Sequence, residues 1–202
     1  MTTVAFWFCK YSFGTMGKAK ILRRTMELPI TTQRLKLRAH SLEDASALRA
    51  FYSQPKVARF LLDEPWNQDT AKAKVEERIS KTDLDGPSHA LALVIESEGQ
   101  VIGDVALWFT DAENRVAEIG WVLDPAYGGQ GYATEAVAAV LSLAFDHYNC
   151  RRVVAQMDAR NNASAKLAER LGMVKEAHHR QDWFSKGEWT DTLIYAMLTS
   201  DR

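Results

Sequence analysis

The chain predicts an α+β protein in which a run of antiparallel strands is followed by strands and helices in alternation. Between residues 89 and 124, apolar and polar residues alternate in three segments separated by polar turns, which is typical of a meander. After residue 133, apolar residues recur twice at helical spacing, and an extended segment follows each time. With 202 residues, 47% of them hydrophobic, the chain can bury the core of one globular domain.

Each element has its own signal. Ser41 stands where it can cap a helix that has acidic residues in its first turn, and Gly172 stands where a left-handed residue ends one. The strands are indicated by alternation and the helices by period 3.6. We therefore expect a strand over 33–39, a helix over 41–53, a short helical segment over 56–62, a helix over 69–82, three strands over 89–97, 101–110 and 112–124, a helix over 134–148, a strand over 151–159, a helix over 161–172, and strands over 176–185 and 189–198.

Composition excludes several classes of function. The formal charge of -1 gives no excess of basic residues for nucleic-acid binding, and no apolar run is long enough to span a membrane. Cys9 and Cys150 form neither a disulfide framework nor a metal-binding spacing. His178 and His179 are adjacent on an expected strand, so their side chains point to opposite faces and chelate one metal poorly. We expect a cytoplasmic protein without a bound metal.

The N-terminal segment differs from the rest in composition. Residues 1–25 contain five basic residues and no acidic one, and the apolar stretch 4–13 lacks the flanks of a signal peptide. We interpret 1–25 as an extension outside the core fold, for example from an upstream translation start, and 26–202 as the working domain. A strand that docks on a neighbouring subunit is the alternative.

The stretch YGGQGYATEA, residues 127–136, carries the main functional signal. Backbone N–H groups at a helix N-terminus bind anions, and glycine lets a phosphate approach without a Cβ in the way. We assign this role to Gly129, Gly131 and Ala133, with the Thr134 hydroxyl as a further donor; an ordinary tight turn is the structural alternative. No Lys follows the glycines as in a P-loop, and the loop follows an antiparallel strand, unlike a dinucleotide fingerprint.

Four stretches in this order resemble the GNAT superfamily of acetyl-CoA-dependent N-acyltransferases, and its ribosomal-protein N-terminal acetyltransferase (Rim-type) branch in particular. They are TQRLKLR, AEIGWVLDPAYGGQGYATEA, DARNNASAKLAERLGM and GEWTDTLIYAML, within residues 29–199. The resemblance implies a GNAT fold: a mixed, mostly antiparallel central sheet of about six to seven strands flanked by about four helices. It also implies acetyl-CoA as co-substrate, an amine acceptor (a small molecule or a protein N-terminus) and, as a family-level expectation, a homodimer.

The resemblance also implies a set of coenzyme contacts. The strand before the loop pairs with the pantetheine arm, the loop holds the pyrophosphate, and Asn161 and Ser164 lie near the pantetheine amide and the sulfur. Gly128 occupies a position where the family usually has Gln or Arg, which removes a side-chain donor. Asn161 and Ser164 could instead serve only as helix-capping residues. The coenzyme-binding residues expected are Val122, Leu123, Gly128, Gly129, Gln130, Gly131, Tyr132, Ala133, Thr134, Asn161 and Ser164.

The expected catalytic residues are Glu118, Ser164 and Tyr195. Glu118 resembles the strand glutamate that acts as general base in many members, although a carboxylate on an exposed strand face is the alternative. The family's tyrosine acid, four residues after Ser164, is Ala168 here, so Ser164, a water molecule or Tyr195 must protonate the leaving thiolate. Aromatic residues that could wall the acceptor site, or be core residues, are Phe51, Tyr52, Phe60, Trp66, Trp108 and Trp183. Asp63 and Glu64 could attract a cationic amine.

Three functions are therefore compared. The first is an N-acetyltransferase acting on a protein N-terminal α-amine or a small amine by direct attack. The second is a non-catalytic acyl-CoA-binding module that regulates a partner, for which the missing tyrosine leaves room. The third, a nucleotide-dependent oxidoreductase, conflicts with the strand order.

Overall fold

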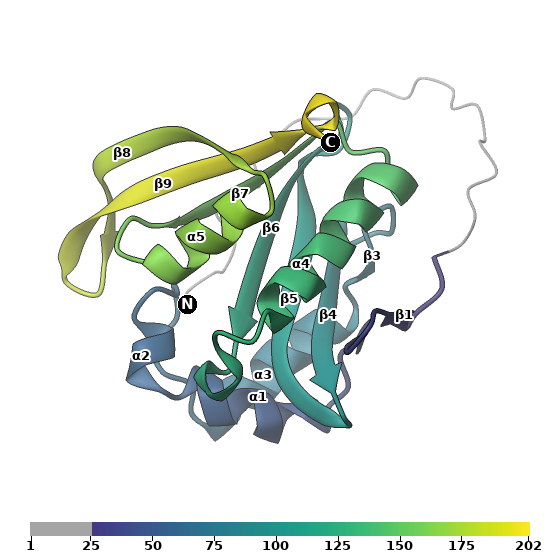
Figure 1. The fold of residues 1–202 in the computed structure, drawn as a ribbon. Coiled ribbons are helices and arrows are strands. Elements are labelled where there is room, and N and C mark those ends of the chain that lie inside the picture. Colours follow the sequence, from purple (N-terminus) through teal and green to yellow (C-terminus); the bar gives the residue numbers. More distant parts are fainter. Residues whose placement is uncertain (1–25) are drawn as a thin grey trace.

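One twisted sheet organises the computed structural model, which describes residues 26–202 (Figure 1). The sheet order is β1-β2-β4-β5-β6-β7-β9-β8, with β3 beside β4. All pairs are antiparallel except β6 with β7, which are parallel because α4 connects them as a crossover. The strands are β1 (Ile30–Thr31), β2 (Lys36–Ala39), β3 (Thr82–Asp83), β4 (Ala90–Ser97), β5 (Gln100–Asp111), β6 (Val116–Leu123), β7 (Arg152–Asp158), β8 (Val174–Ser185) and β9 (Glu188–Leu198).

Helices cover both faces of the sheet. They are α1 (Asp44–Tyr52), α2 (Pro55–Ala58), α3 (Gln68–Ile79), α4 (Tyr132–Ser142) and α5 (Asn162–Arg170). Figure 1 shows α4 and α5 crossing one face. Their apolar residues belong to the main core, with Ala117, Ile119 and Ala155 of the sheet. A second cluster joins α1 and α3 to Val122, whose side chain faces the other way because strand residues alternate.

The α+β class and the mixed, mostly antiparallel sheet are confirmed. The seven longer strands correspond to the seven expected, while β1 and β3, of two residues each, were not foreseen. The expected strand 33–39 begins only at Lys36, because Thr32 and Leu35 close a turn through two hydrogen bonds, of 2.9 and 3.0 Å. The helix expected over 134–148 starts earlier, at Tyr132, and ends in a π-helical turn over Leu143–His147.

The prediction that Ser41 caps the first helix is wrong. The helix begins at Asp44, and its first residues receive no side-chain capping bond. Instead the Asp44 carboxylate accepts hydrogen bonds from the backbone N–H of Ser41, at 2.7 Å, and from the guanidinium of Arg38, at 2.7 and 2.9 Å. The ion pair with Arg38 thus ties the start of α1 to β2. Gly172 does follow α5 with a φ of 84°, as expected.

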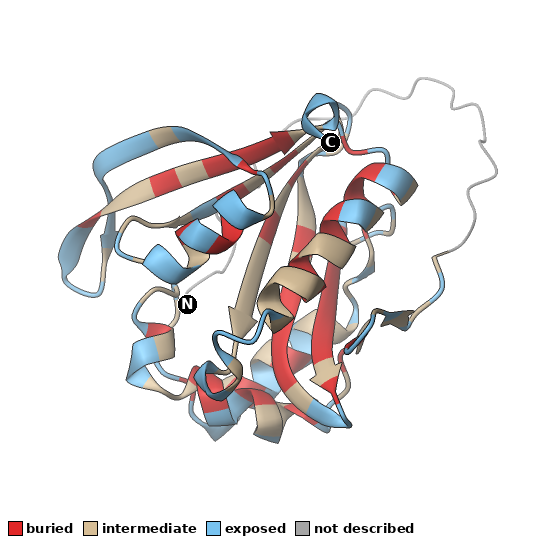
Figure 2. Ribbon diagram, in the orientation of Figure 1, coloured by how far each residue is buried: buried red, intermediate tan, exposed pale blue. Residues whose placement is uncertain are grey.

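Burial follows this layering: the buried residues of α4 belong to the main core, together with residues of the sheet. The β8 strand is largely exposed, as Figure 2 shows, since it lies at the sheet edge. The expected extension 1–25 lies outside the described residues. Over residues 26–202, no helix is long and apolar enough to cross a membrane.

Candidate active site

The two parallel strands separate in the middle of the sheet. Strands β6 and β7 pair at only three positions, and the last pair joins Glu118 to Val154. Beyond it, β6 stays paired with β5 as far as Leu123, and β7 stays paired with β9 as far as Asp158. Figure 1 shows the two strands diverging. The facing edges therefore have unpaired backbone groups that can bind an extended ligand.

Val122 and Leu123 lie on the separated part of β6. Their partners on β5 are Asp104 and Gly103. In an antiparallel ladder, successive residues direct their N–H and C=O groups alternately toward the partner strand and away from it. One of the two residues therefore presents its backbone groups to the opening, as expected for a contact with the pantetheine arm.

The glycine loop forms a concentrated set of unused donors at the start of α4. The backbone N–H groups of residues 129–134 donate to no protein acceptor within residues 26–202, whereas that of Glu135 donates to the carbonyl of Gly131 at 3.0 Å. Gly129 and Gly131 have φ values of 77° and 84°. A Cβ on Gly129 would meet no atom within 4 Å, so the space in front of the loop is open. Together with the helix dipole, these amides suit an anion.

Two arginines that the sequence analysis did not assign lie beside this loop. Arg34, in the turn between β1 and β2, donates to the carbonyl oxygen of Gln130 at 2.9 Å and lies 4.4 Å from the ring centroid of Tyr132. Arg170, at the end of α5, donates to the Thr134 hydroxyl oxygen at 3.0 Å. That bond uses Thr134 as an acceptor and leaves its O–H free to donate. No local spacing signals either arginine, because each is distant from the loop in sequence.

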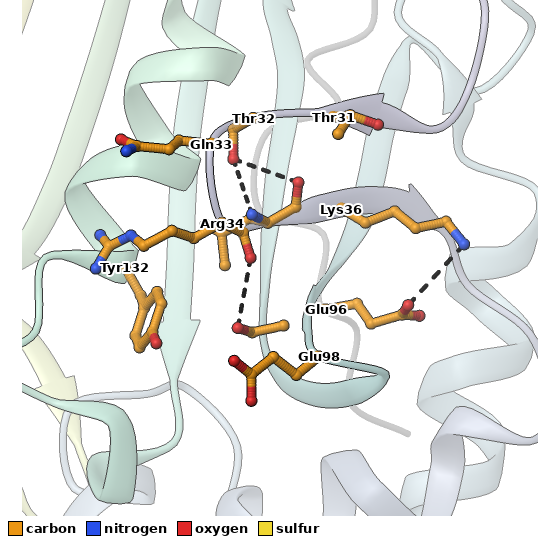
Figure 3. A pocket seen from close by; sticks show the side chains of 10 residues that line it. Thr31, Thr32, Gln33, Arg34, Lys36, Glu96, Glu98 and Tyr132 are labelled. Atoms are coloured by element: carbon orange, nitrogen blue, oxygen red, sulfur yellow. Dashed lines mark hydrogen bonds and ion pairs between the residues drawn. The ribbon is translucent and has the colours of Figure 1, made fainter.

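A hollow of about 430 Å³ adjoins the same loop (Figure 3). It lies between the β1–β2 turn, the β4–β5 turn and Tyr132, whose ring is seen beside the Arg34 side chain. Lys36 reaches Glu96 across it, with an N–O distance of 3.9 Å. None of the expected catalytic residues lines this hollow. It therefore extends the surface at the loop and is separate from the place where the strands diverge.

The start of α5 lies at the same end of the sheet as the start of α4, because both helices follow the carboxyl ends of parallel strands. The Asn161 side-chain oxygen accepts the backbone N–H of Ser164 at 3.2 Å, so Asn161 does cap the helix. Its side-chain N–H₂ and the partly buried Ser164 hydroxyl have no partner within residues 26–202. Capping therefore leaves donors on both residues for a ligand.

Glu118 occupies the vertex where β6 and β7 part. Its carboxylate is partly buried and accepts a hydrogen bond from the Gln156 side chain at 3.1 Å. Burial raises the pKa of Glu118 from its ordinary 4.5 to about 6, and the Gln156 bond acts in the opposite direction. Trp108 of β5 pairs directly with Glu118, so their side chains share a face of the sheet. A carboxylate with this pKa can accept a proton near neutral pH.

Tyr195 lies on the other face of the sheet. It pairs with Ala155, whereas Glu118 shares its row with Val154, and consecutive strand residues point to opposite faces. The Tyr195 side chain is 1% exposed within the core beneath α5, and its hydroxyl donates to Glu169 at 2.9 Å. Burial, followed by the hydrogen bond to Glu169, raises the pKa of the Tyr195 hydroxyl above its ordinary value. Alternation along β9 assigns Tyr195 to a face of its own strand but does not relate that face to the one carrying Glu118.

The expected acceptor-side residues divide into two groups. Phe51, Tyr52 and Trp66 are buried in the cluster of α1 and α3, where Tyr52 and Trp66 stack with ring centroids 3.9 Å apart. They are therefore core residues. Trp183, by contrast, is 41% exposed near the tip of the β8–β9 hairpin. The side chain of Lys186 in the hairpin turn donates to the carbonyl of Ala58 and so holds the hairpin against α2.

The fold places an open helix N-terminus beside two diverging strands, and the comparisons with known proteins give the class, an N-acetyltransferase. Residues 34–174 match the family model described as an acetyltransferase (GNAT) domain, and the chain belongs to this family. It is 30% identical over 167 residues to the uncharacterized N-acetyltransferase p20 of Bacillus licheniformis, covering 83% of this chain and 94% of that protein.

Solved structures share the fold at lower identity. RimL, a ribosomal L7/L12 α-N-protein acetyltransferase in complex with coenzyme A, aligns with a TM-score of 0.76 at 23% identity, over 87% of this chain and all of that one. Spermidine N-acetyltransferase from Vibrio cholerae, in complex with CoA and spermine, aligns with a TM-score of 0.72 at 22% identity, over 84% and 98% of the two chains. The ribosomal-protein-serine acetyltransferase of Escherichia coli is 28% identical over 110 residues, 54% of this chain and 62% of that protein, so Rim-type enzymes are among the distant homologues. The acceptors named for the two solved structures differ in kind.

Proposed function

We propose that the protein transfers the acetyl group of acetyl-CoA to a primary amine by direct attack. The observation that supports this most is the position of the unused N–H groups of residues 129–134, at the end of the sheet where β6 and β7 part beyond Glu118. A pyrophosphate fits these donors, and the free edge of β6 at Val122 and Leu123 fits the amide-bearing pantetheine arm. When bound, acetyl-CoA supplies the thioester that the amine attacks.

Glu118 acts as the general base in this proposal. With a pKa of about 6 it is mainly ionised at pH 7 and can take a proton from an incoming ammonium, directly or through water. An α-amine with a pKa near 8 gives away only about 1.4 kcal/mol to reach its neutral form at pH 7, while a lysine side chain gives away about 4.6 kcal/mol. Deprotonation therefore costs less free energy for an α-amine than for a lysine side chain, so Glu118 suits an α-amine better as the base.

The acid for the departing thiolate is assigned to Ser164 or a water molecule that it holds. Its hydroxyl is free, partly exposed and at the start of α5, near the opening between the strands. Tyr195 is left out of this role because its side chain is buried in the core beneath α5 and its hydroxyl is bound to Glu169.

Of the two acceptor classes, an α-amine fits better than a polyamine. A polyamine needs several uncompensated carboxylates, but Asp63 is paired with Lys74 at 3.0 Å, and Arg160 pairs with both Asp158 and Glu188 at 2.7 and 2.8 Å. Lys74 neutralises Asp63, Arg160 offsets one of its two carboxylates, and Glu64 is the one expected acidic residue without an ion pair within residues 26–202, so the negative charge left for a polycation is small. We therefore propose a protein or peptide N-terminus as the first acceptor to test.

The test is thiol release from acetyl-CoA with a panel of peptides, polyamines and small amines. We expect turnover with at least one α-amine, and a fall of about 10² in kcat/KM for Glu118→Gln, with coenzyme affinity unchanged. Coenzyme binding with no turnover on any acceptor, and no effect of Glu118→Gln, would instead support a non-catalytic acyl-CoA-binding module. Thermal shifts with acetyl-CoA, NAD and ATP test the ligand separately, since a ligand at 100 times its Kd adds about 2.7 kcal/mol of stability.

A further inference from the structure

One side-chain contact bridges the point where the two parallel strands separate. The Gln156 amide nitrogen donates to Oε2 of Glu118 at 3.1 Å, across 38 positions of sequence. Gln156 lies two residues beyond Val154, the last β7 residue paired with β6, and therefore on the face that carries Glu118. The backbone pairing of β6 with β7 has ended there, so this bond links the two strands through side chains at the point where they separate.

The bond gives the two oxygens of Glu118 different roles. Oε2 is occupied by the Gln156 amide, while Oε1 has no hydrogen-bond partner within residues 26–202. The backbone of Gln156 is held by the sheet, because the residues before and after it also pair with β9 and Ile194 lies directly opposite, while its side chain is exposed. A carboxylate anchored through one oxygen by a rigid strand presents the other in a fixed direction, which is what proton transfer requires.

Within residues 26–202, no charged group is among the influences on the Glu118 carboxylate. On the same face of β5, Asp104 is bound by Arg78 at 2.5 Å and by Tyr52 at 2.7 Å. On β7, Asp158 is bound by Arg160. Burial and the Gln156 hydrogen bond are the influences on the pKa of Glu118, and the bond lowers it because an N–H donor favours the ionised form.

We propose that Gln156 is a positioning residue for the general base, holding Glu118 ionised with one oxygen directed to the acceptor amine. This rests on the proposed function of Glu118. Gln156 touches neither substrate in this role, so it acts through Glu118 alone. Its loss should change the titration of the base and the rate of acetyl transfer, but not the binding of the coenzyme.

The test compares Gln156→Met, which keeps the length of the side chain and removes the N–H donor, with Gln68→Met at an exposed position on α3. We expect Gln156→Met to lower kcat about tenfold and to move the acid limb of the pH profile up by about one pH unit, at unchanged coenzyme affinity. Gln68→Met should change none of these. In the Glu118→Gln background, Gln156→Met should have no further effect.

A second measurement does not depend on activity. The Glu118 carboxyl pKa can be followed by NMR in protein with ¹³C-labelled glutamate, with the signal assigned from its absence in Glu118→Gln. A higher pKa in Gln156→Met supports the proposal. An unmoved pKa and pH limb, even with a reduced rate, overturns it while leaving the function of Glu118 intact. If Glu118→Gln itself has no effect on turnover, the proposed function fails instead.

Discussion

Arg34 and Glu135, 101 residues apart in sequence, form an ion pair of 2.7 Å that joins the β1–β2 turn to the first turn of α4. Glu135 also accepts the Thr32 hydroxyl at 2.6 Å and the backbone N–H of Arg34 at 2.8 Å. Arg34 continues to the carbonyl of Gln130. The conformation of the glycine loop is therefore fixed partly by residues near the start of the domain.

Arg34→Met should weaken coenzyme A binding by about threefold to tenfold, since the Gln130 carbonyl loses its donor and a positive charge leaves the loop. Lys36→Met is the matched control, because Lys36 lines the same hollow but pairs with Glu96 rather than with the loop. Isothermal titration with coenzyme A measures both. Equal affinities in the two variants would contradict a role for Arg34 in holding the loop.

Gly129→Ala should cost both stability and coenzyme affinity. Its φ of 77° strains any residue with a Cβ, by about 1 kcal/mol, and that Cβ would stand in the open space before the unused N–H groups. Gly99→Ala is a close control, since Gly99 has the same φ and equally open surroundings but lies in the β4–β5 turn. Denaturant unfolding should show similar losses for both, and titration a loss of affinity for Gly129→Ala only. Loss of affinity in both variants would mean that stability, not the loop, is responsible.

The raised pKa of Glu118 predicts a pH effect on stability as well as on rate. A carboxyl whose pKa is higher in the folded state binds its proton more tightly when folded, so stability decreases as the pH rises from 4.5 through about 6. Glu118→Gln should therefore be more stable than the wild type at pH 8, by about 1–2 kcal/mol, and equal to it at pH 4. Urea unfolding at the two pH values checks this. A variant less stable than the wild type at pH 8 would contradict it.

His40 should make the fold sensitive to acid. Its side chain is 5% exposed, neither ring nitrogen has a hydrogen-bond partner among residues 26–202, and burial lowers its pKa to about 4. Asp104 and Asp44 favour its charged form, while Arg78 and Arg38 oppose it. The unfolded chain binds the proton more readily, so stability contributed by neutral His40 is lost as the pH falls from 6.5 to 4, by about 3 kcal/mol in total.

His40→Leu should remove that loss, giving thermal unfolding curves that change less between pH 7 and pH 5 than those of the wild type. His179→Leu, at an exposed position on β8, serves as the control and should retain the wild-type dependence. If the two variants respond alike, another group governs the acid sensitivity.

The sequence allowed the strands, the helices and the glycine loop to be predicted because their signals are local. Alternation, helical spacing and the left-handed glycines all act within about ten residues. Three features were out of reach for the opposite reason. These are Arg34, Arg170 and Gln156, which only strand pairing and helix packing bring to the site from distant parts of the sequence. Ser41 misled because its hydroxyl donates to the Asp44 carboxylate, at 3.3 Å, and accepts no backbone N–H of the helix.

Faces of the sheet were equally hard to assign from sequence. The alternation along β9 relates Tyr195 to its own strand, but only the pairing of β6 with β7 and of β7 with β9 relates it to Glu118. The parity of those pairings depends on loop lengths and bulges, which a single sequence does not encode in any local pattern.

The two faces of the sheet differ where β6 and β7 diverge. The helices α4 and α5 pack on one face, whereas Glu118 and Trp108 lie on the other. A coenzyme arriving from the first side and an amine arriving from the second would not block each other's path. Both substrates could then be bound at the same time. Double-reciprocal plots of the steady-state rate should intersect, and a dead-end inhibitor that competes with one substrate should still allow the other to bind.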